Sequence, residues 1–107
     1  MKLPTILEEY FRAKNAHDIS AMTACFAQNA IVFDEGEELR GITAIEKWVA
    51  ETTEKYRVSA EPIGLEEENG ETIVKARIAG NFDGSPIDLR FCFILEGEKI
   101  TRLAVRG

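Results

Sequence analysis

Two side chains in the first third of the chain are of the types that move a proton next to a carbonyl group. Asp34 closes the apolar stretch FAQNAIVFD, and Tyr10 lies on an apolar helical stripe. A carboxylate in a mostly apolar pocket becomes more basic because it loses hydration. A phenol is a neutral donor that tolerates an apolar wall and can face a developing oxyanion. Together they would supply the base and the donor of a proton-transfer site, so we predict Asp34 and Tyr10 as catalytic residues.

Each of these residues also has a plain structural interpretation. Asp34 precedes the sequence EGEE over residues 35–38, so it could simply open a solvated acidic turn. Tyr10 shares its stripe with apolar side chains, so it could belong to the core with only its hydroxyl at the rim. Which interpretation applies depends on the helix that carries Tyr10 and the strand that carries Asp34, and on whether both side chains point into a pocket.

The first half of the chain has helical periodicity. Pro4 suits the first turn of a helix over residues 5–15, and Thr5 with Glu8 has the spacing of a capping box. Asp18 is predicted to cap a second, short helix. A second capping box, Thr43 with Glu46, predicts a third helix that ends near residue 56. The predicted buried side of this third helix comprises Ile45, Trp48, Val49 and Thr52.

The second half alternates apolar and polar residues, which is typical of strands. A short strand over residues 30–34 is followed by four longer ones over residues 57–68, 71–82, 86–96 and 99–105. Asn69-Gly70 is a strong hairpin signal between the first two long strands. Because strands of about a dozen residues exceed the usual five or six, the sheet must bend. Gly64 and Gly80 are the predicted bend or bulge points.

These elements predict a single α+β domain over residues 1–107. Helices that precede a run of strands pack on one face of an antiparallel sheet. We expect a strongly bent antiparallel sheet wrapped around three N-terminal helices, forming a cone-shaped barrel. The helices would fill one end of this cone and leave a small-molecule pocket at the other. The residues expected to line that pocket are Phe33, Trp48, Phe91 and Phe93.

Composition argues against several classes of function. A net charge of −6 without clustered Lys or Arg disfavours nucleic acid as a partner. No apolar run reaches the roughly 20 residues of a membrane span, and two early glutamates disfavour a signal peptide. The two cysteines and one histidine lack metal-site spacing, so we expect neither a metal nor a cofactor. Both cysteines lie in apolar stretches, as buried thiols of a cytoplasmic protein would.

Three segments carry a resemblance to a known family. The first is ILEEYFRAKNAHDISAMTACFAQNAIVFD, with a helix, a small-residue turn, a short helix and a strand ending in an acid. The second is RGITAIEKW, which looks like a Gly-x-x-Ala-Ile helix start, and the third is the hairpin series GNFDGSPIDLRFCFILEGEKITRL. In this order they resemble the nuclear-transport-factor-2-like (NTF2-like) superfamily, in its SnoaL-like and ketosteroid-isomerase-like branch. That fold hosts enzymes and non-catalytic modules alike.

The resemblance implies roles for individual residues. Asp34 matches the aspartate that shuttles the proton in ketosteroid isomerases, and Tyr10 matches the tyrosine that donates to the enolate oxygen. The second oxyanion donor of those enzymes, a protonated aspartic acid, falls near Phe91 or Arg90, and neither can take that role. Losing one oxyanion donor typically costs about 10²–10³ in rate.

Two functions therefore stay open from the sequence. One is a small-molecule-binding protein that catalyses proton transfer or isomerisation on an apolar carbonyl or polyketide-like substrate, as an isomerase or lyase. The other is a non-catalytic ligand-binding or dimerisation module of the same fold. The resemblance also implies a homodimer formed through the outer sheet face, where four charged side chains would make the interface polar: Lys75, Arg77, Asp88 and Arg90.

Overall fold

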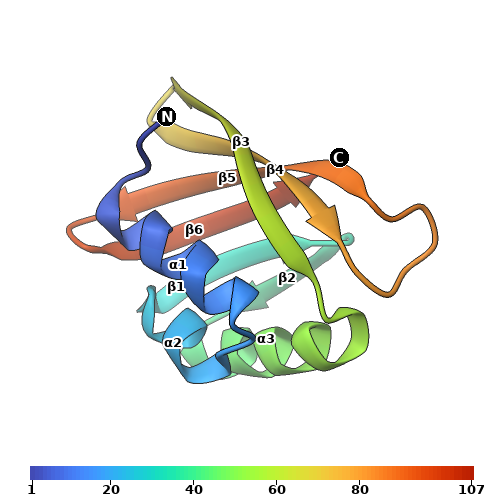
Figure 1. The fold of residues 1–107 in the computed structure, drawn as a ribbon. Coiled ribbons are helices and arrows are strands. Elements are labelled where there is room, and N and C mark those ends of the chain that lie inside the picture. The colour runs from blue at the N-terminus through green and yellow to red at the C-terminus, as the bar shows by residue number, and fades with distance from the viewer.

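The computed structural model describes residues 1–107 and contains three helices and one six-stranded sheet (Figure 1). Their bounds are α1 Thr5–Asn15, α2 Ile19–Ala24, β1 Phe26–Asp34, β2 Glu37–Arg40, α3 Ile42–Tyr56, β3 Ser59–Glu68, β4 Glu71–Ala79, β5 Ile87–Glu96 and β6 Lys99–Arg106. The α+β class and the three N-terminal helices predicted from the sequence are confirmed. None of the helices has the length and apolar character needed to cross a bilayer.

The first two helices begin where predicted, α3 begins slightly earlier, and two of the three caps differ. Asp18 caps α2 and accepts a hydrogen bond of 3.0 Å from the backbone N–H of Ala21, as expected. The two predicted capping boxes are wrong, because α1 starts after Pro4 and α3 starts after Gly41 without a side-chain cap. Thr5 is thus already inside the first turn of α1, and its hydroxyl is not at the capping position.

The sheet is mixed rather than purely antiparallel. Its strand order is β2-β1-β6-β5-β4-β3, and every neighbouring pair is antiparallel except β1 and β6, which run parallel. Three successive hairpins from β3 to β6 fix the direction of β6, while α3 carries the chain across from β2 to β3. The β1–β2 hairpin adds a fourth reversal to these three, and this even number leaves β1 and β6 parallel, which corrects the antiparallel prediction.

The sheet curls around the helices without closing into a barrel. Its two edge strands, β2 and β3, are not paired with each other. A register shift between Pro62 and Gly64 places a bulge at one of the two predicted glycines. The Asn69-Gly70 turn joins β3 to β4 as predicted, with both residues at positive φ. The four-residue strand β2 was missed, because its EELR sequence is exposed and has the composition of an acidic turn.

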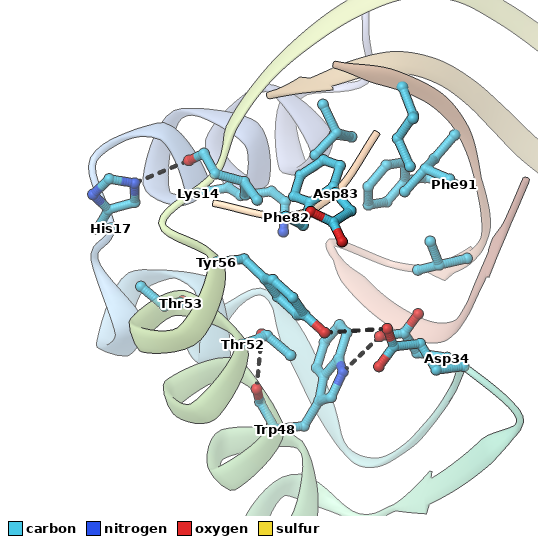
Figure 2. A pocket seen from close by; sticks show the side chains of 16 residues that line it. Lys14, His17, Asp34, Trp48, Thr52, Thr53, Tyr56, Phe82, Asp83 and Phe91 are labelled. Carbon is cyan, nitrogen blue, oxygen red and sulfur yellow. Dashed lines mark hydrogen bonds between the residues drawn. The ribbon is translucent and has the colours of Figure 1, made fainter. Parts of the chain in front are cut away.

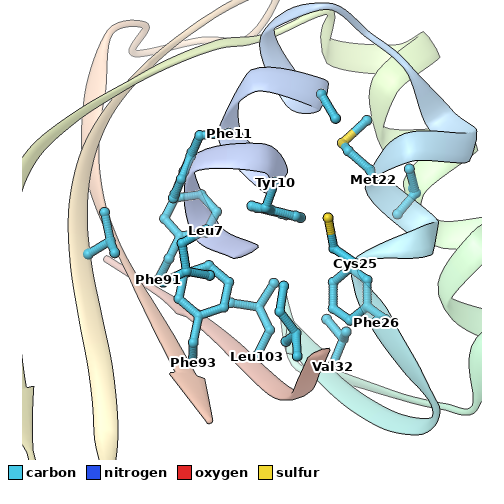
Figure 3. Packing of buried hydrophobic residues seen from close by; sticks show 14 of the residues in the cluster. Leu7, Tyr10, Phe11, Met22, Cys25, Phe26, Val32, Phe91, Phe93 and Leu103 are labelled. Carbon is cyan, nitrogen blue, oxygen red and sulfur yellow. The ribbon is translucent and has the colours of Figure 1, made fainter. Parts of the chain in front are cut away.

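The core lies between α1, α2 and the inner face of the sheet (Figure 3). From α1, the side chains of Leu7, Tyr10 and Phe11 are buried, and β5 contributes Phe91 and Phe93. The aromatic rings meet edge to face, with the centroids of Phe11 and Phe91 at 5.4 Å. This packing fills one end of the fold, and a cavity remains where α1 ends and α3 faces the sheet.

Candidate functional site

A cavity of about 320 Å³ lies at that open end, between the end of α1, the C-terminal half of α3 and the inner face of the sheet (Figure 2). Its walls are mostly apolar, and a few polar groups converge on it, which is the usual composition of a small-molecule site. The lining residues are Lys14, His17, Asp34, Glu35, Trp48, Thr52, Thr53, Tyr56, Val58, Ile78, Phe82, Asp83, Ile87, Leu89, Phe91 and Val105.

Asp34 places its carboxylate in this cavity, as predicted. It is the last residue of β1, and its side chain is half-buried on the inner face of the sheet. Burial raises the pKa of Asp34 above its ordinary value, and the negative charge of Glu35 adds to the rise. A hydrogen bond from Trp48 acts in the opposite direction, because it stabilises the ionised form. The result is a carboxylate of increased basicity that stays in contact with the cavity.

The α3 helix contributes four of the residues that line the site. Ile45 and Val49 anchor the helix in the core, which turns Trp48, Thr52 and Tyr56 toward the cavity at intervals of four residues. The indole Nε1 of Trp48 donates to Oδ2 of Asp34 over 3.0 Å. The hydroxyl of Thr52 donates to the carbonyl oxygen of Trp48 at 2.8 Å. Trp48 thus lines the cavity as predicted and also orients the acid.

Tyr56 brings a phenol to the cavity that the sequence did not indicate. Its hydroxyl donates to Oε1 of Glu35 at 3.3 Å, and its ring meets Phe82 edge to face at 6.1 Å. The residue lies at the end of α3, where Arg57 takes a left-handed conformation and reverses the chain. The available signal was the interval of four residues that places Tyr56 on the same helix face as Trp48 and Thr52.

Lys14 also lines the cavity and was likewise not predicted as a site residue. It occupies the last inward position of the α1 stripe, after Leu7, Tyr10 and Phe11. Its Nζ lies 5.9 Å from the ring centroid of Tyr10 and 5.7 Å from that of Phe91. Loss of hydration lowers the pKa of Lys14 to about 8, although the charge of Asp34 partly offsets this. The available signal was a lone charged residue on an otherwise apolar stripe.

Polar contacts fix the end of α1 against the sheet, next to the cavity. Nε2 of His17 donates to the carbonyl oxygen of Val58 at 2.9 Å. The Asn15 side-chain amide donates to the carbonyl oxygen of Ala60 at 2.9 Å, and its oxygen accepts from the N–H of that residue. These bonds fix the end of α1, which carries Lys14, against the chain entering β3.

Tyr10 does not lie in the cavity wall. It is only 1% exposed and is surrounded by Phe11, Phe26 and Phe93, whose ring centroids lie 5.3–5.8 Å away (Figure 3). Burial also raises the pKa of Tyr10 far above its ordinary value. The structure therefore places Tyr10 in the core and does not bring it together with Asp34 in the cavity, which leaves its predicted donor role without support.

Of the three phenylalanines predicted to line the pocket, only Phe91 does so. Phe93 is fully buried in the core, two residues further along β5. Phe33 lies on the outer sheet face, where the guanidinium of Arg102 is 4.8 Å from its ring centroid. The reason is the alternation of a strand, because Phe33 and its neighbour Asp34 must point to opposite faces. No group of three or more His, Cys, Asp or Glu is arranged to hold a metal ion.

Comparisons with known proteins agree with this architecture. The model of the SnoaL-like domain family matches residues 7–103, so the chain belongs to that family. A putative polyketide cyclase from Sinorhizobium meliloti has a similar structure, with 33% identity, a TM-score of 0.91, and coverage of 97% of this chain and 95% of that one. No curated protein matches the sequence significantly.

Two more distant structures show the same fold. A protein with a ketosteroid isomerase-like fold from Catenulispora acidiphila, solved in complex with trimethylamine, has 19% identity and a TM-score of 0.84, covering 99% of this chain and 87% of its own. A putative polyketide cyclase from Pseudomonas putida has 18% identity and a TM-score of 0.80, covering 95% and 88%. The resemblance to the NTF2-like, ketosteroid isomerase-like fold is thereby confirmed.

Proposed function

We propose that the protein binds a small, largely apolar carbonyl compound in the cavity and that Asp34 transfers a proton at the carbon next to the carbonyl group. The observation that carries the proposal is the Asp34 carboxylate, which lines the cavity, is held by Trp48 at 3.0 Å and has a raised pKa. A base with these properties removes a weakly acidic C–H proton and returns it at another carbon, as an isomerase or lyase requires.

The comparisons support this proposal at the level of substrate class. The family is SnoaL-like, and the Sinorhizobium meliloti protein at 33% identity bears the name of a putative polyketide cyclase. Polyketides carry carbonyl groups flanked by acidic C–H bonds, so a cavity with mostly apolar walls and the basic carboxylate of Asp34 suits them. The partner we propose is therefore a small apolar molecule, with proton transfer as the reaction.

Hydrogen exchange tests the proposal directly. A panel of small ketones and polyketide-like diketones is incubated with the protein in D₂O, and loss of the α-proton signal is followed by NMR. We expect Asp34→Asn to reduce the exchange rate by at least about 10². Asp88→Asn, the same substitution on the outer sheet face, provides the matched control and should exchange at the wild-type rate. Equal rates in wild-type and Asp34→Asn protein would remove Asp34 from the mechanism.

A non-catalytic ligand-binding module is the second candidate function. It is favoured by the position of Tyr10 in the core, because the cavity then lacks the phenol donor that the resemblance implied. In that case, compounds from the same panel would raise the melting temperature without any exchange of their α-protons. Thermal shift and exchange, measured on the same compounds, distinguish the two functions.

We also propose that the protein is a cytoplasmic homodimer. Its two cysteines, Cys25 and Cys92, are both free thiols, which agrees with a reducing compartment. Cys92 lies on the outer sheet face beside Ile73 and Ala104, and with Phe33 they form an apolar band across four strands. Sedimentation equilibrium tests the dimer, and Ala104→Glu in the middle of the band should shift it to monomer.

A further inference from the structure

Lys14 is the only lysine or arginine that lines the cavity. Its ammonium forms no hydrogen bond or ion pair within the chain, and its contacts are the faces of two aromatic rings. The amine is not sealed in the core, because no buried side-chain nitrogen lacks a partner. Figure 2 shows Lys14 reaching from the end of α1 toward the same cavity as Asp34. Lys14 is thus an unpartnered amine that faces the space where a ligand would lie.

Proton removal next to a carbonyl group also requires a sink for the electron pair that stays on carbon. A hydrogen-bond donor at the carbonyl oxygen is one solution. In this structure Tyr10 is in the core, and Tyr56 donates its hydroxyl to Glu35. A primary amine offers another solution, because it converts the carbonyl into an iminium ion that withdraws electrons more strongly.

We propose that the Nζ of Lys14 forms an imine with the carbonyl carbon of a small apolar ketone or aldehyde, and that Asp34 acts on the C–H bond next to it. Only the second part of this inference, proton removal by Asp34, rests on the proposed function. Imine formation by Lys14 does not require Asp34 to transfer a proton.

The step balances without any further reactant. The neutral amine adds to the carbonyl carbon and gives a carbinolamine. The carbonyl oxygen then leaves as water with the two amine hydrogens, and protonation of the imine nitrogen gives the iminium ion. Asp34 removes the adjacent proton, so the C–H electron pair moves toward nitrogen and an enamine forms. Reprotonation at carbon and addition of water release the product and regenerate Lys14.

The environment of Lys14 favours the neutral amine that this reaction needs. With a pKa of about 8, about one tenth of the amine is neutral at pH 7, far more than for an exposed lysine. The cause is burial against the rings of Tyr10 and Phe91, which remove water but offer no anionic partner. Desolvation in an apolar pocket is an established way to activate a lysine as a nucleophile.

Reductive trapping tests the proposal on the wild-type protein. The protein is incubated with benzaldehyde and sodium cyanoborohydride at pH 7, and the modified lysines are located and quantified by peptide mass spectrometry. Benzaldehyde has no α-hydrogen, so it reports imine formation independently of proton transfer. We expect Lys14 to be labelled at least tenfold faster than the exposed Lys47 of the same chain.

Two variants separate this proposal from the proposed function. Lys14→Arg keeps the cation but cannot form a stable imine, so it should lose the fast label while the other lysines keep theirs. Asp34→Asn should keep the fast label even though it loses exchange of α-protons. Labelling of Lys14 at no more than the rate of Lys47 would overturn the imine, whatever the outcome for Asp34. Full exchange activity in a folded Lys14→Arg variant would overturn the part of the imine in proton transfer.

Discussion

The indole Nε1 of Trp48 donates a hydrogen bond of 3.0 Å to Oδ2 of Asp34, which joins the middle of α3 to the end of β1. This bond favours the ionised carboxylate and counteracts burial, which favours the protonated form. Trp48 therefore tunes the basicity of Asp34 as well as holding it in place.

Replacing Trp48 by Phe should raise the pKa of Asp34 further. The phenyl ring still covers the carboxylate, but it has no N–H to donate to it. A base works in its ionised form, so the rate of α-proton exchange rises with pH through the pKa of Asp34 and its midpoint moves to higher pH in Trp48→Phe. The pH profile of exchange measures this midpoint. Tyr56→Phe removes a donor from Glu35 instead and should leave the midpoint nearly unchanged. An unshifted midpoint in Trp48→Phe would show that the indole does not tune the acid.

Asp34 should make the protein less stable as pH rises through its own titration. Its pKa is raised in the folded state, so between the unfolded value near 3.8 and the raised value the folded chain binds more protons. The free energy of unfolding therefore falls with increasing pH across that window. In Asp34→Asn the free energy of unfolding should not fall in this window, because the amide does not titrate. Its side-chain oxygen can still accept the hydrogen bond from Trp48.

The expected result is a higher melting temperature for Asp34→Asn than for wild type at pH 7 and the same melting temperature at about pH 3. Asp88→Asn, on the outer face, should show no such pH-dependent gain. Thermal melts of the three proteins across this range test the expectation. Parallel curves for Asp34→Asn and wild type at all pH values would contradict it.

Lys14 has the opposite dependence on pH. Its folded pKa of about 8 lies below the ordinary 10.5, so the unfolded chain binds more protons between these values and stability rises with pH there. At pH 7 the half-buried charge is a net cost. We expect Lys14→Met to raise the free energy of unfolding at pH 7 by roughly 2 kcal/mol and by less at pH 9.5. Denaturant titrations at the two pH values measure the difference, with the exposed Lys75→Met as control. A Lys14→Met variant that is less stable at pH 7 would refute the assignment of a desolvated amine.

Local sequence signals determined most of the fold. The α1 bounds, the Asp18 cap and the Asn69-Gly70 turn depend on residues adjacent in the chain, and the structure confirms all three. The parallel pairing of β1 with β6 was not predictable in this way, because it depends on how many reversals separate two distant strands. The exposed strand β2 was missed for a related reason, since its pairing with β1 leaves no apolar pattern.

The site was predicted only in part, for physical reasons that differ between residues. Asp34 and Trp48 were placed correctly because a strand end and a helix face determine their directions. Tyr10 and Lys14 share one stripe of α1, and only the depth of the helix in the fold decides which of them reaches the cavity. Phe33 could have been excluded from the sequence alone, because it alternates with Asp34 along one strand.

Gly80 allows α3 and the end of β4 to approach closely enough to form the cavity. A Cβ at this position would lie 2.6 Å from the carbonyl oxygen of Tyr56 and 2.9 Å from Cγ1 of Val58. The Tyr56 carbonyl cannot easily move away, because it accepts a hydrogen bond of 2.8 Å from the N–H of Asn81. Gly80→Ala should therefore lower the free energy of unfolding by about 1–3 kcal/mol and displace Tyr56 from the cavity wall.

Gly64→Ala is the matched control, because the added Cβ would lie at an ordinary 3.5 Å from Cβ of Lys75. Both glycines lie in or next to strands, and neither has a positive φ, so the two variants differ mainly in the space available. Denaturant titration should show a loss for Gly80→Ala that clearly exceeds that for Gly64→Ala. Tight ligands of the cavity should also lose affinity in Gly80→Ala alone, because Tyr56 and Val58 both line it. Equal stability of the two variants would show that the chain can accommodate a Cβ at position 80, and that the close approach of α3 to β4 does not depend on Gly80.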